Sequence, residues 1–297
     1  MAEPQTTVGV DVSGTRIKAV AVRFNGEVVD ERIEPTVDDV DSLFDAVGGV
    51  IAGLAPVGAA IGVSAPGIAA RDSRSIAWMR GRMQAVEGLD WQQRLGRNIW
   101  VLNDAHAAAL GEGWIGAARS VMDAVVLTLD TGVGGGLILR GRLFQGASGR
   151  AGHLGHITLN MDGPPDIVGT PGSLEDCIGN HTLLVRSGGR FRDTAELVKA
   201  AVAGDAAATE CWRQGVRGLA VGIASMVNAF DPEIVVLGGG IAECGPALFE
   251  LLSDFLDEVE WRPTVERVPV VAAELGELAG AIGAARFAAL RSYKERA

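Results

Sequence analysis

The sequence predicts an α/β protein built from two similar halves, because the same succession of strands, glycine turns and helices occurs twice. A valine-rich strand carries Asp11 near its end and leads into a turn at 13–15, and a second apolar strand leads into Asp130 and a glycine-rich turn. Two further short strands, then helix and another strand, follow each turn. A duplication of this kind predicts two domains with an active-site cleft between them.

The first half is expected to form a sheet flanked by helices. Alternating or continuously apolar segments predict strands at 6–12, 17–24, 27–33, 59–63 and 99–102. Asn25-Gly26 indicates a hairpin, because both residues tolerate positive φ. Apolar residues at helical spacing predict a helix over 38–54. The last strand leads through Asn103 into Asp104 and a small-residue helix over 105–110.

The second half repeats this order after a boundary that we place near Ala117. Strands are expected at 124–129, 137–139, 143–144 and 233–237, and helices at 194–203 and 206–230. Glycine turns occupy 130–136 and 238–240, and residues 146–190 form a long insertion. The predicted domains are therefore 1–117 and 118–277, and the last helix, about 278–297, is expected to pack back on the first domain.

Composition and charge limit the classes of function. The chain has 297 residues, of which 48% are hydrophobic, and a formal net charge of −11. An acidic chain without a basic stripe is expected to bind neither nucleic acid nor an anionic membrane. The longest apolar stretch, Leu219–Phe230, is shorter than the roughly 20 residues that span a bilayer. Three scattered cysteines predict no disulfide framework, and the start lacks a signal-peptide pattern, so we expect a soluble, cytoplasmic protein.

The glycine turns indicate phosphate binding. Glycine lets backbone N–H groups approach phosphate oxygens without interference from a Cβ atom. Asp11 and Asp130 would repel a phosphate, so a carboxylate there is useful where it faces Mg²⁺ through water. Neither turn is a Walker loop, since no Gly-Lys-Ser/Thr follows. One such turn is usually plain turn chemistry, but two at equivalent places, with a third at 238–240, favour a nucleotide site.

Asp104 is the candidate catalytic base. It stands between an apolar strand and a helix, where a carboxylate within hydrogen-bond reach of a hydroxyl can accept its proton as the hydroxyl attacks a phosphate. Phosphoryl transfer otherwise needs mainly positioning and charge neutralisation. The alternative role for Asp104 is that of a helix N-cap, for which aspartate is well suited.

These motifs resemble the ROK family of sugar kinases and sugar-responsive repressors, within the actin-like ATPase (ribonuclease H-like) fold, and the resemblance covers essentially the whole chain. The catalytic segment is similar to Leu102-Asn103-Asp104-Ala105-x-Ala107-Ala108-Ala109-Leu110-Gly111-Glu112. The nucleotide turns are similar at Asp11, Gly14 and Thr15, at Thr131, Gly132, Gly134 and Gly135, and at Gly238, Gly239 and Gly240. The loop Ser64-Ala65-Pro66-Gly67 resembles a sugar-contacting loop, through Pro66 and Gly67.

The resemblance implies an ATP-dependent, Mg²⁺-assisted kinase of the glucokinase type that phosphorylates a hexose or related sugar. It implies Asp104 as general base, Asn103 as a residue that holds sugar hydroxyls, and a homodimer. The alternative is a non-catalytic sugar sensor of the same fold. A DNA-binding repressor is not expected, since no helix-turn-helix fits before Thr6. The sugar, the hydroxyl and a polyphosphate donor in place of ATP stay open.

The chain departs from the family in its zinc and sugar segment. The family pattern Glu-x-Gly-His is followed by three cysteines, whereas here His153 replaces the glutamate, and the three cysteine positions hold Asp166, Val168 and Ser173. Valine cannot coordinate a metal, and the thiolates of a tetrahedral zinc site are absent. We therefore expect no structural zinc. The alternative is a remodelled metal site of His153, His156 and Asp166.

His156 and Glu175 still match the family's sugar-contacting positions. Each also has a plainer role, since His156 could be a core histidine and Glu175 could favour the dipole of a helix that begins after Ser173. A histidine at 153 offers one donor and one acceptor where glutamate only accepts, so the sugar preference is expected to change at that end. His106 replaces a common asparagine and could line the pocket or only pack.

Overall fold

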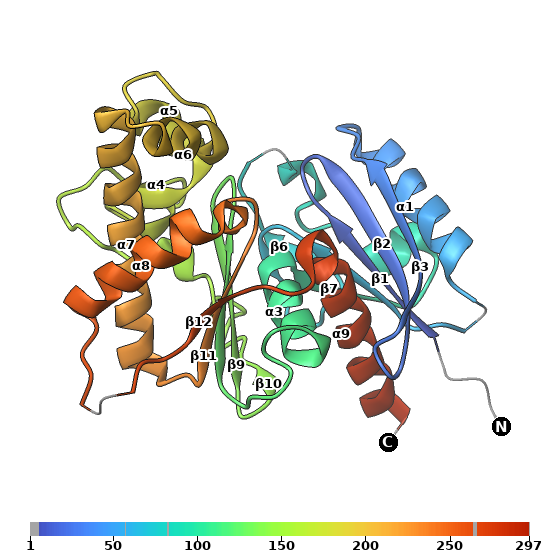
Figure 1. The fold of residues 1–297 in the computed structure, drawn as a ribbon. Coiled ribbons are helices and arrows are strands. Elements are labelled where there is room, and N and C mark those ends of the chain that lie inside the picture. The colour runs from blue at the N-terminus through green and yellow to red at the C-terminus, as the bar shows by residue number, and fades with distance from the viewer. Residues whose placement is uncertain (1–5, 57, 82, 264–265, 297) are drawn as a thin grey trace. The chain divides into compact units, whose positions relative to one another are not determined.

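The computed structural model describes residues 6–56, 58–81, 83–263 and 266–296, which fold into two compact units (Figure 1). The first unit contains the chain up to Ser120, with 136–152 and 274–297. The second contains 121–135 and 153–273. The predicted domains differ from these units chiefly at 136–152, which clusters with the first unit, and also at the two boundaries, because 118–120 and 274–277 belong to the first unit. Where the functional domain boundary lies stays a prediction.

The first unit is built on a five-stranded sheet in the order β3-β2-β1-β4-β7. Its strands are β1 (Thr6–Val12), β2 (Arg16–Arg23), β3 (Val28–Pro35), β4 (Ile61–Ala65) and β7 (Ile99–Asn103). The first three strands pair antiparallel, and β4 and β7 join parallel to β1. The three parallel strands therefore end at one edge of the sheet, where function-bearing side chains gather in α/β folds.

Helices cover both faces of this sheet. Along β2, Ile17, Ala19 and Ala21 join the core beneath α1 (Val40–Leu54), whereas Val20 and Val22 pack on α9 (Ala279–Arg296). This alternation is the period of two that a strand imposes on its side chains. The helix α3 (Asp104–Ile115) packs along α9, and its buried Glu112 accepts backbone N–H groups from Ala117, Glu274 and Leu275.

Short elements between β4 and β7 escaped prediction because they are too brief to show a period. They are β5 (Ile68–Ala69), β6 (Ile76–Trp78), the 3₁₀ helix η1 (Gln84–Val86) and α2 (Trp91–Leu95). Together they add Ile76 and Trp91 to the core.

The second sheet has the order β10-β9-β8-β11-β12. Its strands are β8 (Ala124–Leu129), β9 (Val133–Leu139), β10 (Arg142–Leu143), β11 (Ile234–Gly238) and β12 (Val270–Ala272). The strand β11 lies parallel to both β8 and β12. The turn predicted over 130–136 is shorter than expected, because β9 begins at Val133 and includes Gly134 and Gly135.

Helices and short 3₁₀ segments complete the second unit. The helices are α4 (Leu174–Ile178), α5 (Asn180–Arg186), α6 (Thr194–Val202), α7 (Ala206–Phe230) and α8 (Pro246–Val259), and the 3₁₀ segments are η2 (Leu154–His156) and η3 (Ala242–Cys244). The apolar run within α7 contributes to the core, with Leu219, Ile223 and Met226 buried. No helix in the described ranges is long and apolar enough to cross a membrane. The cysteines carry free thiols.

Close approach of α9 to the first sheet depends on glycines. A Cβ atom at Gly62 of β4 would lie 2.0 Å from the carbonyl oxygen of Ala284, and one at Gly9 of β1 would lie 1.9 Å from that of Ala281. A Cβ at Gly283 would lie 1.6 Å from the carbonyl of Ala107 in α3. These are backbone atoms that cannot rotate away, so only glycine permits this packing.

We predict that Gly62→Ala lowers the free energy of unfolding by about 3 kcal/mol, because the added methyl forces α9 away from the sheet. Urea unfolding followed by circular dichroism measures the change. The matched control is Gly49→Ala on α1, where a Cβ meets nothing within 4 Å. That variant is expected to gain about 0.5–1 kcal/mol from lower backbone entropy in the unfolded chain. Equal effects of the two substitutions would contradict the packing argument.

Candidate functional site

Two carboxylates of the first unit lie at the edge where its parallel strands end. Asp11 is directly opposite Ser64 of β4, and Ala65 is opposite Asn103, the last residue of β7. Asp104 follows at once as the first residue of α3. The strand register thus brings together Asp11 and Asp104, which are far apart in the sequence.

Asp11 is a buried carboxyl, only 7% exposed. The Ser64 hydroxyl donates a hydrogen bond of 2.7 Å to its Oδ1. Burial, together with the nearby Asp104 carboxylate, raises the pKa of Asp11 to about 6, against the opposing effects of Ser64 and Lys18. Because both causes disfavour the ionised form of Asp11, a cation beside this carboxyl would stabilise it.

Lys18 is a functional candidate that sequence reasoning missed. It lies on β2 directly opposite Asp11, and its Nζ is 3.9 Å from Asp11 Oδ2. Its side chain is 17% exposed, so the ammonium group is held beside Asp11 rather than extended into solvent. The hairpin of β1 and β2 could have identified Lys18, because residues at equal distances from a tight turn face one another across the two strands.

Asn103 caps α3 and orients Asp104. Its Oδ1 accepts the N–H of His106 at 2.9 Å, so Asn103 and not Asp104 is the N-cap. Its Nδ2 donates to Asp104 Oδ1 at 2.8 Å and to the carbonyl of Gly67 at 2.9 Å. The alternative role of Asp104 as cap is therefore wrong. Asn103 Oδ1 has a second lone pair, which can accept a hydrogen bond from a hydroxyl group.

Asp104 is held through one of its carboxylate oxygens. Its Oδ1 accepts the amides of Asn103 and Ala105, at 2.8 Å each. Burial raises the pKa of Asp104 above its usual range, while these hydrogen bonds and the Lys18 cation oppose the rise. A carboxylate with a raised pKa is a stronger proton acceptor, as general base catalysis needs.

The loop after β4 requires glycine. Gly67 has φ of +96°, and a Cβ there would lie 2.5 Å from the carbonyl oxygen of Trp78. With Pro66 before it, this residue brings the loop to the amide of Asn103. The turn after β1 is also in place: Gly14 is half-buried, Thr15 is exposed, and Ser13 Oγ accepts the N–H of Arg16 at 3.1 Å.

The second unit gathers its own glycine turns at the end of β8. Gly132 lies against Glu175, whose Oε2 accepts the N–H of Val133 at 2.9 Å. Gly239 has φ of +85°, and a Cβ there would meet the carbonyl of Leu129 at 2.3 Å. The predicted nucleotide residues of this half therefore lie in two adjacent places. They are Thr131, Gly132, Gly134 and Gly135 on one side, and Gly238, Gly239 and Gly240 on the other.

His156 and Asp166 form a second feature of this unit. His156 Nδ1 lies 2.8 Å from Asp166 Oδ2. Although burial favours the neutral acid, hydrogen bonds from His156 and from the amides of Thr170 and Val168 hold the pKa of Asp166 below its usual range. Asp166 is therefore a carboxylate at neutral pH.

His153 and His106, which stand where the ROK pattern has other residues, have different surroundings. His153 is half-buried and immediately precedes η2. His106 is buried in α3, and its Nε2 donates to the carbonyl of Ala151 at 2.7 Å. Burial lowers the pKa of His106. His106 therefore fixes the segment that leads to His153 rather than only filling space.

A cluster of possible metal ligands lies elsewhere. Ligand atoms of Glu175, Asp176 and His181 lie within 4.8 Å of one another, and it is the only such group among the residues the structure describes. Each already has a protein partner: Glu175 bonds to the amide of Val133, and His181 bonds to Asp176 and to the Thr131 carbonyl. The trio of His153, His156 and Asp166 does not form a comparable group within the described ranges.

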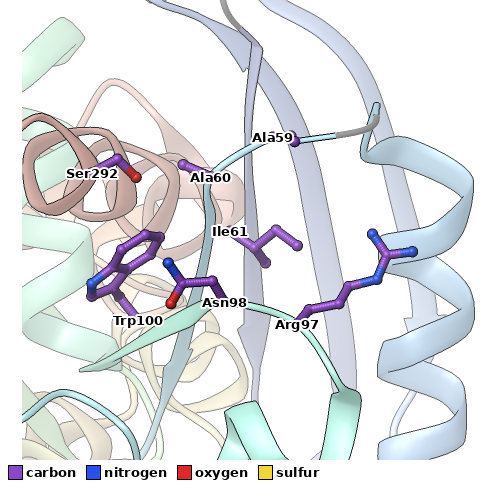
Figure 2. Close-up of a pocket in the computed structure, with 8 residues that line it drawn as sticks. Ala59, Ala60, Ile61, Arg97, Asn98, Trp100 and Ser292 are labelled. Carbon is purple, nitrogen blue, oxygen red and sulfur yellow. The ribbon is translucent and has the colours of Figure 1, made fainter. Parts of the chain in front are cut away.

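A cavity of about 270 Å³ in the first unit lies away from these carboxylates (Figure 2). It sits where β4 and β7 begin, whereas Asp11 and Asp104 sit where the parallel strands end. Its lining is Gly58, Ala59, Ala60, Ile61, Arg97, Asn98, Trp100 and Ser292. This cavity is therefore not the predicted sugar or nucleotide site.

Comparison with known proteins identifies the family. The ROK family profile matches residues 7–290. A glucokinase of Streptomyces coelicolor is 29% identical over 95% of this chain and 97% of its own length. An N-acetyl-D-glucosamine kinase of Photobacterium profundum is 32% identical over 93% of this chain and 97% of its own.

Solved structures agree with the sequence relatives. A ROK hexokinase from Thermus thermophilus matches with a TM-score of 0.83 and 33% identity, over 98% of this chain and all of that one. A ROK glucokinase from Streptomyces griseus, solved with glucose and AMPPNP, matches with a TM-score of 0.80 and 29% identity, over 96% and 99% of the two chains. The expected actin-like ATPase fold is confirmed, and the chain belongs to the ROK family as a carbohydrate kinase.

Proposed function

We propose that the protein transfers the γ-phosphoryl group of ATP to a hydroxyl of a hexose or related sugar, with Asp104 as the general base. The observation that carries this proposal is the arrangement at Asp104. Asn103 caps α3 and at the same time orients the Asp104 carboxyl by a hydrogen bond to Oδ1, and we propose that Oδ2 accepts the substrate hydroxyl. A hydroxyl whose proton is accepted there becomes a competent nucleophile toward phosphorus.

The first unit also contains a positive charge beside one of its buried carboxylates. Lys18 places an ammonium group beside Asp11, which offsets part of the repulsion that two carboxylates exert on a triphosphate. In the proposed reaction Lys18 would contact the transferring phosphoryl group, where negative charge is spread over three oxygens. The turn at Gly14 and Thr15 would present backbone amides to the phosphates.

Mg²⁺ fits the oxygen donors at Asp11. The carboxyl is buried and paired with a hydroxyl, and its raised pKa shows that the site favours neutralisation of the carboxylate charge. We propose that Asp11 would hold the ion through water. When bound, Mg²⁺ neutralises charge on the phosphate oxygens.

Sugar recognition is proposed for residues of both units. In the first, Gly67 and Pro66 hold the loop that bonds to Asn103. In the second, His153, His156 and Glu175 would contact hydroxyls. Glucose or N-acetylglucosamine is the natural first candidate, since these sugars name the relatives at 29–32% identity. A homodimer and a cytoplasmic location also stay predictions.

A panel assay tests this function. ADP release is measured with ATP and Mg²⁺ across hexoses, amino sugars and inositols, and a parallel series replaces ATP by inorganic polyphosphate. Turnover of at least one hexose or amino sugar is expected. Sugar binding in a thermal-shift assay without turnover of any sugar by either donor would instead favour the non-catalytic sensor.

We predict that Asp104→Asn lowers kcat by about 10²–10⁴-fold, because the amide cannot accept the hydroxyl proton. Sugar binding, measured by thermal shift or calorimetry, should remain near that of the wild type, since the amide keeps the shape of the side chain. The matched control is Asp45→Asn, the same chemical change on the exposed face of α1. An Asp104→Asn variant with wild-type turnover would refute the assignment.

The pH profile tests Lys18. Because the Lys18 cation helps to keep Asp104 ionised, Lys18→Met raises the pKa of Asp104. The base must be deprotonated to act, so the acidic limb of the kcat/KM profile is expected to move to higher pH. At pH 7 we expect a decrease in kcat/KM of about tenfold or more, since a stabilising charge is also lost. Lys18→Arg keeps the positive charge and should leave the limb near its wild-type position; a shift of equal size in both variants would contradict this role.

A further inference from the structure

The segment 160–173 of the second unit is folded around one carboxylate, that of Asp166. The side chain is fully buried. Its Oδ1 accepts the N–H groups of Val168 at 3.0 Å and Thr170 at 2.8 Å, and its Oδ2 lies 2.8 Å from His156 Nδ1. The backbone of Asp166 also bonds to Thr170 and Gly169. Asp166 therefore closes the loop on itself and ties the loop to His156.

The charge of Asp166 decides where the ring proton of His156 resides. An ionised carboxylate only accepts hydrogen bonds, so His156 Nδ1 must be the donor. In the neutral imidazole the other nitrogen, Nε2, then carries a lone pair and accepts. The His156 side chain is 26% exposed, so a ligand can reach it.

A metal ion in this place would do the opposite. A metal bound to Nδ1 leaves the proton on Nε2, which then donates. The residues present do not fit such an ion: Val168 has no ligand atom, and both oxygens of Asp166 are already occupied by N–H donors. A bound zinc would also need electron-pair donors where this loop offers backbone amides.

We propose that Asp166 takes the place of a metal ion as the positioning residue of this loop, holding His156 so that its Nε2 accepts a hydrogen bond from a substrate hydroxyl. The contact with a hydroxyl rests on the proposed function. The orientation of His156 by Asp166 does not, and it can be measured without turnover. The chain thus recognises one sugar hydroxyl as a donor where a metal-bound histidine would treat it as an acceptor.

Nitrogen NMR of the imidazoles tests the orientation directly. The chain has 4 histidines, so His156 can be assigned by comparison with His156→Gln. At about pH 8, where an ordinary imidazole is neutral, we expect a protonated Nδ1 and an unprotonated Nε2 for His156. Protonated Nε2 with bare Nδ1 would overturn the proposal, as would one tightly held zinc per chain in protein purified without a histidine tag.

Asp166→Asn separates charge from shape. The amide oxygen can still accept from Val168 and Thr170, while the NH₂ group now donates to His156 Nδ1. The proton should therefore move to Nε2, with the fold kept. The matched control is Asp176→Asn, which alters a second His–Asp pair of this unit, at His181, and should leave the His156 signals unchanged. A His156 proton that stays on Nδ1 in Asp166→Asn would overturn the proposal.

Kinetics test the contact with the substrate. For the sugar that the wild type phosphorylates, Asp166→Asn should raise KM by about tenfold with kcat nearly unchanged. A merely structural defect would reduce active enzyme and hence kcat. An unchanged KM would overturn the hydroxyl contact. If no sugar is phosphorylated or bound, the proposed function fails together with this contact, whereas the NMR result still decides the orientation of His156.

A reciprocal variant covers the case in which Asp166→Asn fails to fold. Combining Asp166→Cys, Val168→Cys and Ser173→Cys supplies three thiolates beside His156, a donor set suited to zinc. One zinc per chain, together with a protonated Nε2 on His156, is expected. If this variant folds without binding zinc, the carboxylate and a metal are not interchangeable at this place, and the proposal is wrong.

Discussion

Burial of two carboxylates at the carboxyl edge of the first sheet is the constraint on which the rest of this unit depends. A lone ionised carboxylate is costly to remove from water, so Asp11 and Asp104 require partners of fixed geometry. Ser64 supplies a hydroxyl, Asn103 an amide, and Lys18 a cation. The strand register places each partner, so a change of register would also change the surroundings of the two carboxylates.

Close helix packing makes this edge possible. A Cβ at Gly280 of α9 would meet the Asp11 carboxyl at 2.7 Å, so the helix backbone itself walls the carboxylate off from water. The same helix approaches β4 at Gly62 and α3 at Gly283. Gly280 and Gly283 therefore let α9 pack close enough to bury the Asp11 carboxyl, and this burial raises its pKa. The close packing of α9 therefore contributes both to the stability of the first unit and to the raised pKa of Asp11.

The sequence predicted most of the long elements and the order of the motifs, because long segments show their period, but it did not predict α5 (Asn180–Arg186) or the 14-residue α8 (Pro246–Val259). It failed for β5, β6 and α2, where too few residues repeat, and for the start of β9, where glycine and valine fit both turn and strand. Asp104 was found by motif, but Lys18 was not, since its role depends on pairing across β1 and β2. The sequence grouped His156 with Asp166 only as a possible metal site, and the direct contact of the Asp166 carboxylate with Nδ1 of that ring was not predicted.

The loop around Asp166 illustrates why the proposed exchange of a metal ion for a carboxylate would involve several positions. A metal gathers electron-pair donors such as thiolates, whereas a carboxylate gathers N–H groups. A single cysteine changed to aspartate would face other thiolates with nothing to donate. Here Val168 and Thr170 present backbone amides instead, and Glu112 of the first unit is held in the same way by three backbone N–H groups. In the proposed role of Asp166, the aspartate and the neighbouring backbone amides therefore act together to orient His156.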